Sequence, residues 1–284
     1  MEIIVGKNSG FCNGVNYTVN KTKEVLMNND NVYCLGEIVH NEEVVNELER
    51  LGMITVNDIN EVPNNSKVIL RAHGEPLSTY EIAKNKNLEV IDLTCGKIRI
   101  IHKDIEKHNN SFIIIIAKHN HPETIGTKGH TKYSFVLETS DEMDDCLKAY
   151  KESKRNSIYV ISQTTFNSKK FDELVSLIEK EFKGIDITIN KSICNATELR
   201  QNEVIELSKK VDLMIIIGGK NSSNTKELYN LAKKNCSNTY LIQNYEDIDF
   251  DINDNMKIGI MAGASTSNDT VSKVIDKIKK TTIK

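Results

Sequence analysis

Residues 211–225 read VDLMIIIGGKNSSNT, and this stretch decides the fold class of the chain. The apolar run 211–217 predicts a buried strand, and the Gly218-Gly219 pair followed by polar residues predicts a turn that leads into a helix. The start of such a helix offers free backbone N–H groups and a partial positive charge, which suit a phosphate group. Ser and Asn are also common N-caps, so a purely structural role of the turn is the alternative.

The same strand–turn–helix step recurs along the chain. Amphipathic segments such as 171–182 and 271–278 place apolar residues on one helix face. Strands that alternate with helices predict an α/β fold with mostly parallel sheets. The expected strands are Val32–Leu35, Lys67–Leu70, Glu89–Ile91, Phe112–Ala117, Ser134–Val136, Ser157–Ile161, Asp186–Ile189, Leu213–Ile217, Thr239–Leu241 and Lys257–Met261.

Composition excludes several classes of protein. The 284 residues include 37 basic and 40 acidic side chains, a net charge of −3, so the basic domain typical of nucleic-acid binders is missing. The N-terminal stretch lacks the features of a signal peptide, and no apolar run approaches the roughly 20 residues of a membrane-spanning helix. We therefore expect a cytoplasmic protein with reduced cysteines and with neither nucleic acid nor membrane as a partner.

Three of the six cysteines lie in polar turns just before helical segments: Cys12, Cys95 and Cys194. A helix N-terminus favours a thiolate, and thiolates are the usual ligands of iron–sulfur clusters. These cysteines are far apart in sequence and form no C-x-x-C pair, so unrelated buried residues are the alternative. The remaining three are expected to be small buried residues: Cys34, Cys146 and Cys236.

Histidines also follow expected strands. His40 and His73 come at strand ends, and His121 belongs to a His-Pro-Glu unit whose Glu123 is a candidate proton donor. A histidine at a strand end is a buried residue, a metal ligand or a diphosphate donor. Three further histidines lie in polar stretches and are expected to be solvated: His102, His108 and His130.

Two more turns repeat the arrangement of residues 218–225. They are Gln163-Thr164-Thr165 and Ala264-Ser265-Thr266, each after an expected strand. In parallel α/β sheets, ligands bind outside the carboxyl ends of the strands. Three hydroxyl-rich turns and several histidine turns at these ends favour a phosphate or diphosphate site.

Taken in order, nine short motifs carry a family resemblance. They are GFCNGV at 10–15, IVHN at 38–41, RAHG at 71–74, TC at 94–95, HPE at 121–123, QTT at 163–165, ICNAT at 193–197, KNSSN at 220–224 and AGAS at 262–265. Over nearly its whole length the chain resembles the 4-hydroxy-3-methylbut-2-enyl diphosphate reductase family. Members of this family catalyse the last step of the non-mevalonate isoprenoid pathway.

This resemblance implies an α/β fold arranged as a pseudo-threefold trefoil of three domains around a central cluster and cavity. Residues 1–13 would be an N-terminal segment that carries the first cluster cysteine. Residues 14–96, 97–193 and 194–284 would be the three α/β domains. The implied reaction is the reductive dehydroxylation of 4-hydroxy-3-methylbut-2-enyl diphosphate to isopentenyl and dimethylallyl diphosphate.

The resemblance also implies the cofactor and the site. A 4Fe-4S cluster would be held by Cys12, Cys95 and Cys194, which leaves one iron open for substrate. Glu123 would be the catalytic proton source. The implied substrate-binding residues are His40, His73, His121, Thr164, Ser222, Ser223, Asn224 and Ser265.

The sequence lacks a G-x-G-x-x-G fingerprint, so a separate ferredoxin or flavodoxin is the expected electron donor. It departs from the family pattern at Gly96 (usually proline), at Asn120 (usually glycine) and at Ser267-Asn268 (usually proline and an acid). These departures leave open a paralogue that reduces another phosphorylated substrate. The residues are also compatible with a non-catalytic iron–sulfur or zinc sensor and with a metal-free sugar- or nucleotide-phosphate binder.

Overall fold

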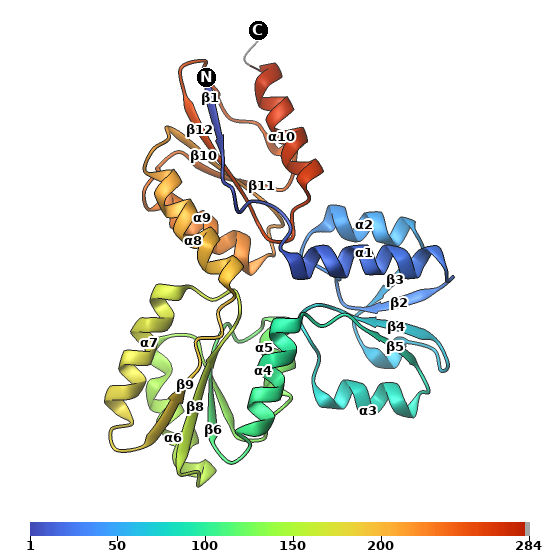
Figure 1. The fold of residues 1–284 in the computed structure, drawn as a ribbon, viewed down its shortest axis with the longest axis vertical. Helices are drawn as coiled ribbons and strands as arrows, with labels where there is room; N and C mark the ends of the chain where they lie inside the picture. Colours follow the sequence, from blue (N-terminus) through green and yellow to red (C-terminus); the bar gives the residue numbers. More distant parts are fainter. Residues whose placement is uncertain (282–284) are drawn as a thin grey trace. The chain divides into compact units, whose positions relative to one another are not determined.

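Residues 1–281 are described by the computed structural model, and they form three parallel sheets of four strands each (Figure 1). In spatial order, sheet B contains β3 (Met53–Val56), β2 (Val32–Leu35), β4 (Lys67–Leu70) and β5 (Glu89–Asp92). Sheet C contains β7 (Ser134–Leu137), β6 (Phe112–Ile116), β8 (Ser157–Ser162) and β9 (Asp186–Ile189). Sheet A contains β11 (Thr239–Ile242), β10 (Leu213–Ile217), β12 (Lys257–Ala262) and β1 (Glu2–Val5).

All three sheets have the same strand order. In sheets B and C, the second strand along the chain is at one edge, followed by the first, the third and the fourth. Sheet A repeats this order with β1 in the fourth place, where Glu2 lies opposite Lys257 and Val5 opposite Ile260. The fold is therefore a threefold repeat in which the first strand of the chain completes the last sheet.

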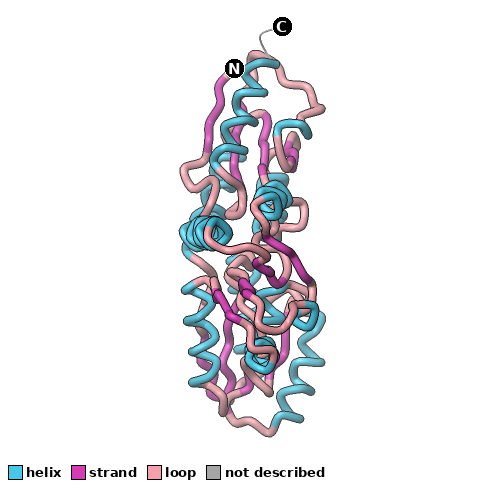
Figure 2. The backbone as a smooth tube through the Cα atoms, turned by 90° about the vertical axis from the view of Figure 1, so that its right-hand side faces the viewer, coloured by secondary structure: helices cyan, strands magenta, loops and turns pink. Residues whose placement is uncertain are grey.

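Helices follow the strands, as the tube view shows (Figure 2). They are α1 (Asn13–Met27), α2 (Glu42–Arg50), α3 (Leu77–Asn85), α4 (Gly96–Lys107), α5 (Pro122–Lys128), α6 (Met143–Ser153), α7 (Ser168–Glu181), α8 (Asn195–Ser208), α9 (Ser223–Lys233) and α10 (Asn268–Thr281). Three short 3-10 turns complete the order: η1 (Ile59–Glu61), η2 (Ser140–Glu142) and η3 (Tyr245–Asp247).

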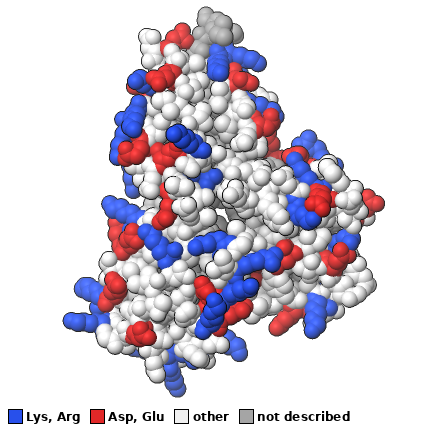
Figure 3. Space-filling view, in the orientation of Figure 1, with Lys and Arg blue, Asp and Glu red and all other residues white. Residues whose placement is uncertain are grey.

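Charged side chains of both signs are interspersed over the face drawn in Figure 3, in keeping with the small net charge. Within residues 1–281, no helix is long and apolar enough to cross a bilayer. The chain divides into two compact units. Unit 1 comprises Met1–Lys23, Val39–Leu51 and the part from Asn195 on, and unit 2 comprises Glu24–Ile38 and Gly52–Cys194. Sheet A belongs to unit 1, and sheets B and C belong to unit 2.

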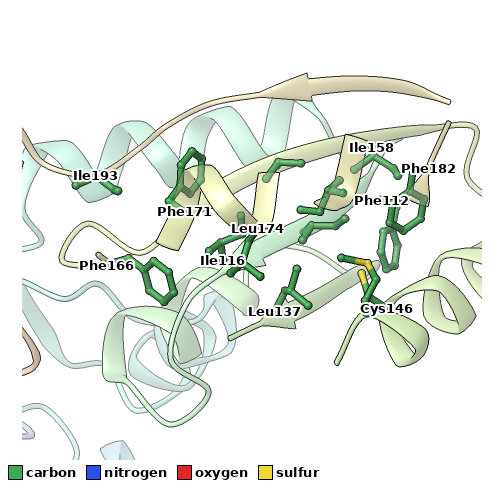
Figure 4. Packing of buried hydrophobic residues seen from close by; sticks show 14 residues of the cluster. Phe112, Ile116, Leu137, Cys146, Ile158, Phe166, Phe171, Leu174, Phe182 and Ile193 are labelled. Atoms are coloured by element: carbon green, nitrogen blue, oxygen red, sulfur yellow. The ribbon is translucent and has the colours of Figure 1, made fainter. Parts of the chain in front are cut away.

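Continuous apolar runs form the central strands because helices cover their sheets. All five residues of β6 are buried, and all five of β10. In sheet C, Phe171 and Leu174 of α7 belong to the same buried cluster as Phe112 (Figure 4), and so does Ile178. Burying one such side chain contributes roughly 2 kcal/mol. These cores hold the carboxyl ends of the strands in place, and the polar turns begin there.

The predicted α/β class and its threefold repetition are confirmed, and all ten expected strands are present. Segments 171–182 and 271–278 match α7 and α10 closely. Two strands were missed, β1 and β3. Each has only four residues and includes half-exposed or exposed positions, so neither produces a long apolar run. The domain boundaries at 13/14, 96/97 and 193/194 stay a prediction.

Candidate functional site

The three cysteines expected to bind metal occupy equivalent places in the three repeats. Cys95 lies between β5 and α4, Cys194 between β9 and α8, and Cys12 between β1 and α1. In each case this is the turn from the fourth strand of a sheet to the helix that follows. The gaps between the three cysteines, 83 and 99 residues, suit one cysteine from each of three α/β units of similar length, and the structure adds that all three occupy the equivalent turn.

Exposure separates the six cysteines into the same two groups. All are free thiols; Cys12, Cys95 and Cys194 are partly exposed, whereas the other three are buried. Burial raises the pKa of Cys146 to about 12, so this thiol stays protonated. The predicted structural role of the buried group is therefore confirmed for its members, Cys34, Cys146 and Cys236.

Each cysteine turn is hydrogen-bonded to the turn after the third strand of its own sheet. The N–H of Cys95 donates to the carbonyl of Ala72 at 3.0 Å. The N–H of Cys194 donates to Thr164 O at 2.9 Å, and that of Cys12 to Ala264 O at 3.2 Å. The three acceptors are candidate binding residues or their immediate neighbours. The fold thus links every thiol turn to one candidate binding turn.

In unit 2, Glu123 and Thr164 form a buried acid–hydroxyl pair. Glu123 lies in the first turn of α5 and is only 3% exposed. Thr164 donates from its backbone N–H to Oε1 at 2.6 Å and from Oγ1 to Oε2 at 2.7 Å. Burial raises the pKa of Glu123 to about 7, although the Thr164 hydrogen bonds act in the opposite direction. A carboxyl group with this pKa exchanges protons readily at neutral pH.

His121 and His73 lie next to this pair in unit 2. Their ring centroids are 5.6 Å apart in an edge-to-face arrangement. His121 caps α5, because its Nδ1 accepts the backbone N–H of Glu123 at 3.1 Å. A neutral His121 therefore carries its proton on Nε2, where it can donate to a ligand oxygen.

Gly74 and Gly126 allow the turn that carries His73 to approach α5 closely. A Cβ on Gly126 would lie 2.5 Å from the carbonyl oxygen of Gly74, and Gly74 itself has φ +74°. Any larger residue at Gly126 would displace the turn that carries His73. The local geometry explains why glycine stands at both positions.

In unit 1, residues 222–224 form the start of α9. Ser222 is its N-cap and accepts the N–H of Thr225 at 3.3 Å. Ser223 and Asn224 are also buried, with exposed fractions of 7% and 5%. The Nδ2 of Asn224 is buried and has no hydrogen-bond partner within residues 1–281. A buried amide donor without an acceptor is costly, so this group indicates a place for a ligand acceptor.

His40 and Ser265 meet in the same unit. The Oγ of Ser265 donates to the carbonyl of His40 at 3.4 Å, and Asn41 Nδ2 donates to Ser265 O at 2.8 Å. A Cβ on Gly219 would lie 2.1 Å from His40 O. The turns that follow β2, β10 and β12 are therefore joined at close range, and only glycine at position 219 allows this approach.

The expected solvation was wrong for His102 and His130, whereas His108 is half-buried. His102 is 6% exposed and stacks on His130 with ring centroids 3.8 Å apart. Burial lowers the pKa of His102 to about 3. His108 stacks on Tyr159 at 3.8 Å. The signal was present, because His102 shares the buried stripe of α4 with its isoleucines, Ile98, Ile101 and Ile105.

The residues that depart from the family pattern cause little change in the packing around them. A Cβ on Gly96 would meet no atom within 4 Å, and Gly96 is the first residue of α4, a position that also suits proline. Asn268 begins α10, and its Oδ1 lies 2.6 Å from the position of a Cβ on Gly10. Asn120 lies in the turn before α5.

Comparisons with known proteins agree over almost the full chain. The family model described as LytB protein matches residues 3–279. A 4-hydroxy-3-methylbut-2-enyl diphosphate reductase of Petrotoga mobilis is 35% identical, and the alignment covers 97% of this chain and 96% of that protein.

Solved structures are similar as well. The E-1-hydroxy-2-methyl-but-2-enyl-4-diphosphate reductase of Plasmodium falciparum has a TM-score of 0.87 and 30% identity, covering 97% of this chain and 87% of that one. A second structure, of an (E)-4-hydroxy-3-methyl-but-2-enyl diphosphate reductase named as the terminal enzyme of the non-mevalonate pathway, has a TM-score of 0.70 and 34% identity. This match covers 99% of the present chain and 100% of the other.

Proposed function

The chain belongs to the LytB protein family, and its matched relatives are 4-hydroxy-3-methylbut-2-enyl diphosphate reductases. We propose that it catalyses the reductive dehydroxylation of 4-hydroxy-3-methylbut-2-enyl diphosphate. The product would be a mixture of isopentenyl and dimethylallyl diphosphate. Replacing the allylic hydroxyl by hydrogen consumes two electrons and two protons and releases water. The observation that carries the proposal is the buried Glu123–Thr164 pair, which provides a proton donor tuned to neutral pH.

The cysteines fit an iron–sulfur cofactor. Cys12, Cys95 and Cys194 are partly exposed free thiols at equivalent turns, each directly before a helix. The N–H of Val15 points to Cys12 Sγ at 3.4 Å, which is an arrangement that stabilises a thiolate. We propose that these three residues hold a 4Fe-4S cluster with one iron lacking a protein ligand. When bound, the cluster supplies the two electrons one at a time.

Glu123 would deliver a proton to the substrate hydroxyl, which then leaves as water. Thr164 would hold the carboxyl group in place through its two hydrogen bonds, one to each carboxyl oxygen of Glu123. Burial keeps part of the Glu123 population protonated at neutral pH, because its pKa is about 7. The carboxyl group is regenerated when the remaining carboxylate takes up a proton from solvent.

Neutral donors would bind the diphosphate. The Nδ2 of Asn224 is a buried donor that lacks an acceptor, and His121 presents the proton on Nε2. Hydroxyl, amide and imidazole groups bind the two phosphates without placing a fixed positive charge next to the leaving hydroxyl. The proposed binding residues are His40, His73, His121, Thr164, Ser222, Ser223, Asn224 and Ser265.

We further propose that electrons come from a ferredoxin or flavodoxin and that the protein acts in the cytoplasm. The first proposal is supported by the missing nucleotide-binding fingerprint. A paralogue with another substrate is less well supported. The departure from the family pattern at Gly96 lies in open space, where a Cβ would meet no atom within 4 Å, so glycine at this position does not indicate an altered site.

The test is anaerobic purification followed by an assay with 4-hydroxy-3-methylbut-2-enyl diphosphate and a low-potential reductant. We expect a brown protein that turns over this substrate, and a Cys12→Ser variant that does not. Cys236→Ala is the matched control, because Cys236 is a buried cysteine outside the proposed ligand set. A brown protein without turnover would reject the proposed substrate, and a colourless protein would reject the cluster.

A further inference from the structure

The segment between β1 and α1 has to place Cys12 without being a helix or strand itself. Residues 6–12 form no regular element. Their polar groups are nevertheless bound within unit 1. The N–H of Gly6 donates to Ile260 O, the N–H of Ala262 donates to Ser9 Oγ at 3.1 Å, and the Cys12 N–H donates to Ala264 O. Two further sets of contacts come from α8.

Glu203 binds the start of this segment with both carboxylate oxygens. Its Oε1 accepts the N–H of Lys7 at 2.6 Å, and its Oε2 accepts the N–H of Asn8 at 2.9 Å. The side-chain Nδ2 of Asn8 also donates to Oε2, at 2.8 Å. Two consecutive backbone N–H groups on one carboxylate form a charge-assisted clamp that fixes the direction of the chain.

Arg200 binds the other end of the segment, two residues before the thiol. Its side chain is buried, with 4% exposure; Nη2 donates to Gly10 O at 2.7 Å and Nη1 to Ala196 O at 2.8 Å. A buried guanidinium is costly unless it is hydrogen-bonded, and its planar fork can hold two carbonyls at a fixed angle. One arm is thus anchored on α8 and the other on the loop.

Gly10 is restricted further by its own conformation. Its φ is +89°, in the left-handed region that favours glycine. The Oδ1 of Asn268 lies 2.6 Å from the place a Cβ would take. The carbonyl that Arg200 binds therefore belongs to a residue at which only glycine fits, two positions before Cys12.

Unit 2 contains a weaker version of the same device. Arg99 donates from Nε to Thr94 O at 3.1 Å and from Nη2 to Asp92 O at 2.6 Å, just before Cys95. The Arg99 side chain is 49% exposed, in contrast to the buried Arg200. Arginine-to-carbonyl bonds thus hold the backbone ahead of two thiols, and only one of these arginines is shielded from water.

We propose that Arg200 and Glu203 are positioning residues that fix residues 7–12 and thereby the thiol of Cys12. The role as a cluster-ligand support rests on the proposed function, whereas the effect on the thiol itself does not. Because residues that orient metal ligands typically change metal affinity by about 10- to 100-fold, we expect iron loss to a chelator to be faster by at least about tenfold in Arg200→Gln.

The experiment compares Arg200→Gln, Arg200→Lys and Glu203→Gln with Asn202→Ala, an exposed neighbour on α8. Full-length protein is purified anaerobically, and iron release, the EPR spectrum of the reduced protein and the melting temperature are measured. After chelation, iodoacetamide labelling of each cysteine is followed by peptide mass spectrometry.

We expect the labelling rate of Cys12 relative to Cys95 to rise about tenfold in Arg200→Gln, since the loop opens locally. The Cys12 to Cys95 labelling ratio should rise less in Glu203→Gln and in Arg200→Lys than in Arg200→Gln. In Asn202→Ala this ratio should match that of the wild type. An altered EPR line shape should accompany the change in ratio.

An unchanged labelling ratio would overturn the proposal, and so would an equal rise at all three thiols, which indicates general loosening. If Arg200→Gln fails to fold, Arg200→Lys and Glu203→Gln give the same ratio test. If the wild-type protein holds no iron, the proposed function fails, while the labelling ratio still decides whether α8 positions Cys12.

Discussion

Sheets C and A present the same two turns, after their first and third strands, but fill them with different chemistry. In sheet C the turns carry Glu123 and Thr164, whose groups satisfy each other at 2.6 and 2.7 Å. In sheet A they carry Asn224 and Ser265 among other neutral groups, and the buried amide donor of Asn224 has no partner in the described part of the chain. The pair in sheet C includes a titratable group that can transfer a proton, whereas the neutral donors in sheet A can bind an anion.

The difference shows how one strand order can supply two functions. Position is fixed by the repeated sheet, because the turns follow equivalent strands. Chemistry is fixed by a few side chains at these positions, which the packing of the cores does not constrain. The proposed roles predict that Glu123 controls proton transfer and that Asn224 controls substrate binding, and the following variants separate these roles.

The largest effect is expected for Glu123→Gln. A positioned general acid contributes about 10²- to 10⁴-fold to rate, so kcat should fall by that factor while KM changes little. Steady-state kinetics with the allylic diphosphate would measure both. Thr164→Ser, which keeps the hydroxyl, is the control and should retain most of the turnover. Near-normal kcat in Glu123→Gln would remove the contrast between the two pairs of turns.

The second effect is on stability as a function of pH. The folded pKa of Glu123, about 7, is above its ordinary value of 4.5. Its stabilising contribution is therefore fully present below pH 4.5 and is lost as pH rises through 7, by about 3 kcal/mol. Urea unfolding at pH 5 and pH 8 should show this loss in the wild type. Glu123→Gln should lack it; an identical pH difference in both proteins would contradict the cause we assign.

The buried ring of His102 should change the folding stability with pH in the opposite direction. Its folded pKa, about 3, is below its ordinary value of 6.5, because burial disfavours the charged ring. The unfolded chain takes up a proton as pH falls below 6.5 while the folded chain does not, so stability drops by about 2 kcal/mol at pH 5. Unfolding of His102→Gln at pH 7 and pH 5 should show a smaller drop. A drop equal to that of the wild type would mean that other groups cause the acid sensitivity.

The smallest effects should distinguish two neighbours in sheet A's first turn. Asn224→Ala removes a donor without a partner, so KM should rise roughly tenfold while the unliganded protein loses little stability. Ser222→Ala removes the cap of α9 and should cost about 1 kcal/mol without ligand. Thermal unfolding with and without substrate separates the two. Equal losses in both variants without ligand would assign Asn224 a structural role.

The strands could be predicted wherever the apolar run was long. Runs such as 112–117 and 213–217 are buried on both faces and have no competing interpretation as surface segments. β1 and β3 escaped because each has only four residues and lacks a long apolar run, and the pairing partner of β1 lies far along the chain. The repeat of strand order became visible only once β1 was placed beside β12.

For the site, residue types and turns could be predicted, but partners could not. The Glu123–Thr164 hydrogen bonds join turns after different strands, and no local pattern specifies them. His102 was misread because the helix around it is rich in charged residues, although its neighbours on the helix face are apolar. Contacts such as those of Arg200 with Gly10 depend on distant chain segments and lie beyond local pattern.

The placement of β1 has a consequence for synthesis on the ribosome. β1 cannot pair until β12 has been made, because Glu2 lies opposite Lys257 and Val5 opposite Ile260. Sheets B and C use strands that are consecutive along the chain and can form as they emerge. Sheet A is completed only after β12 has emerged. The segment leading to Cys12 is attached to β1, so its thiol turn acquires its final surroundings only at that stage.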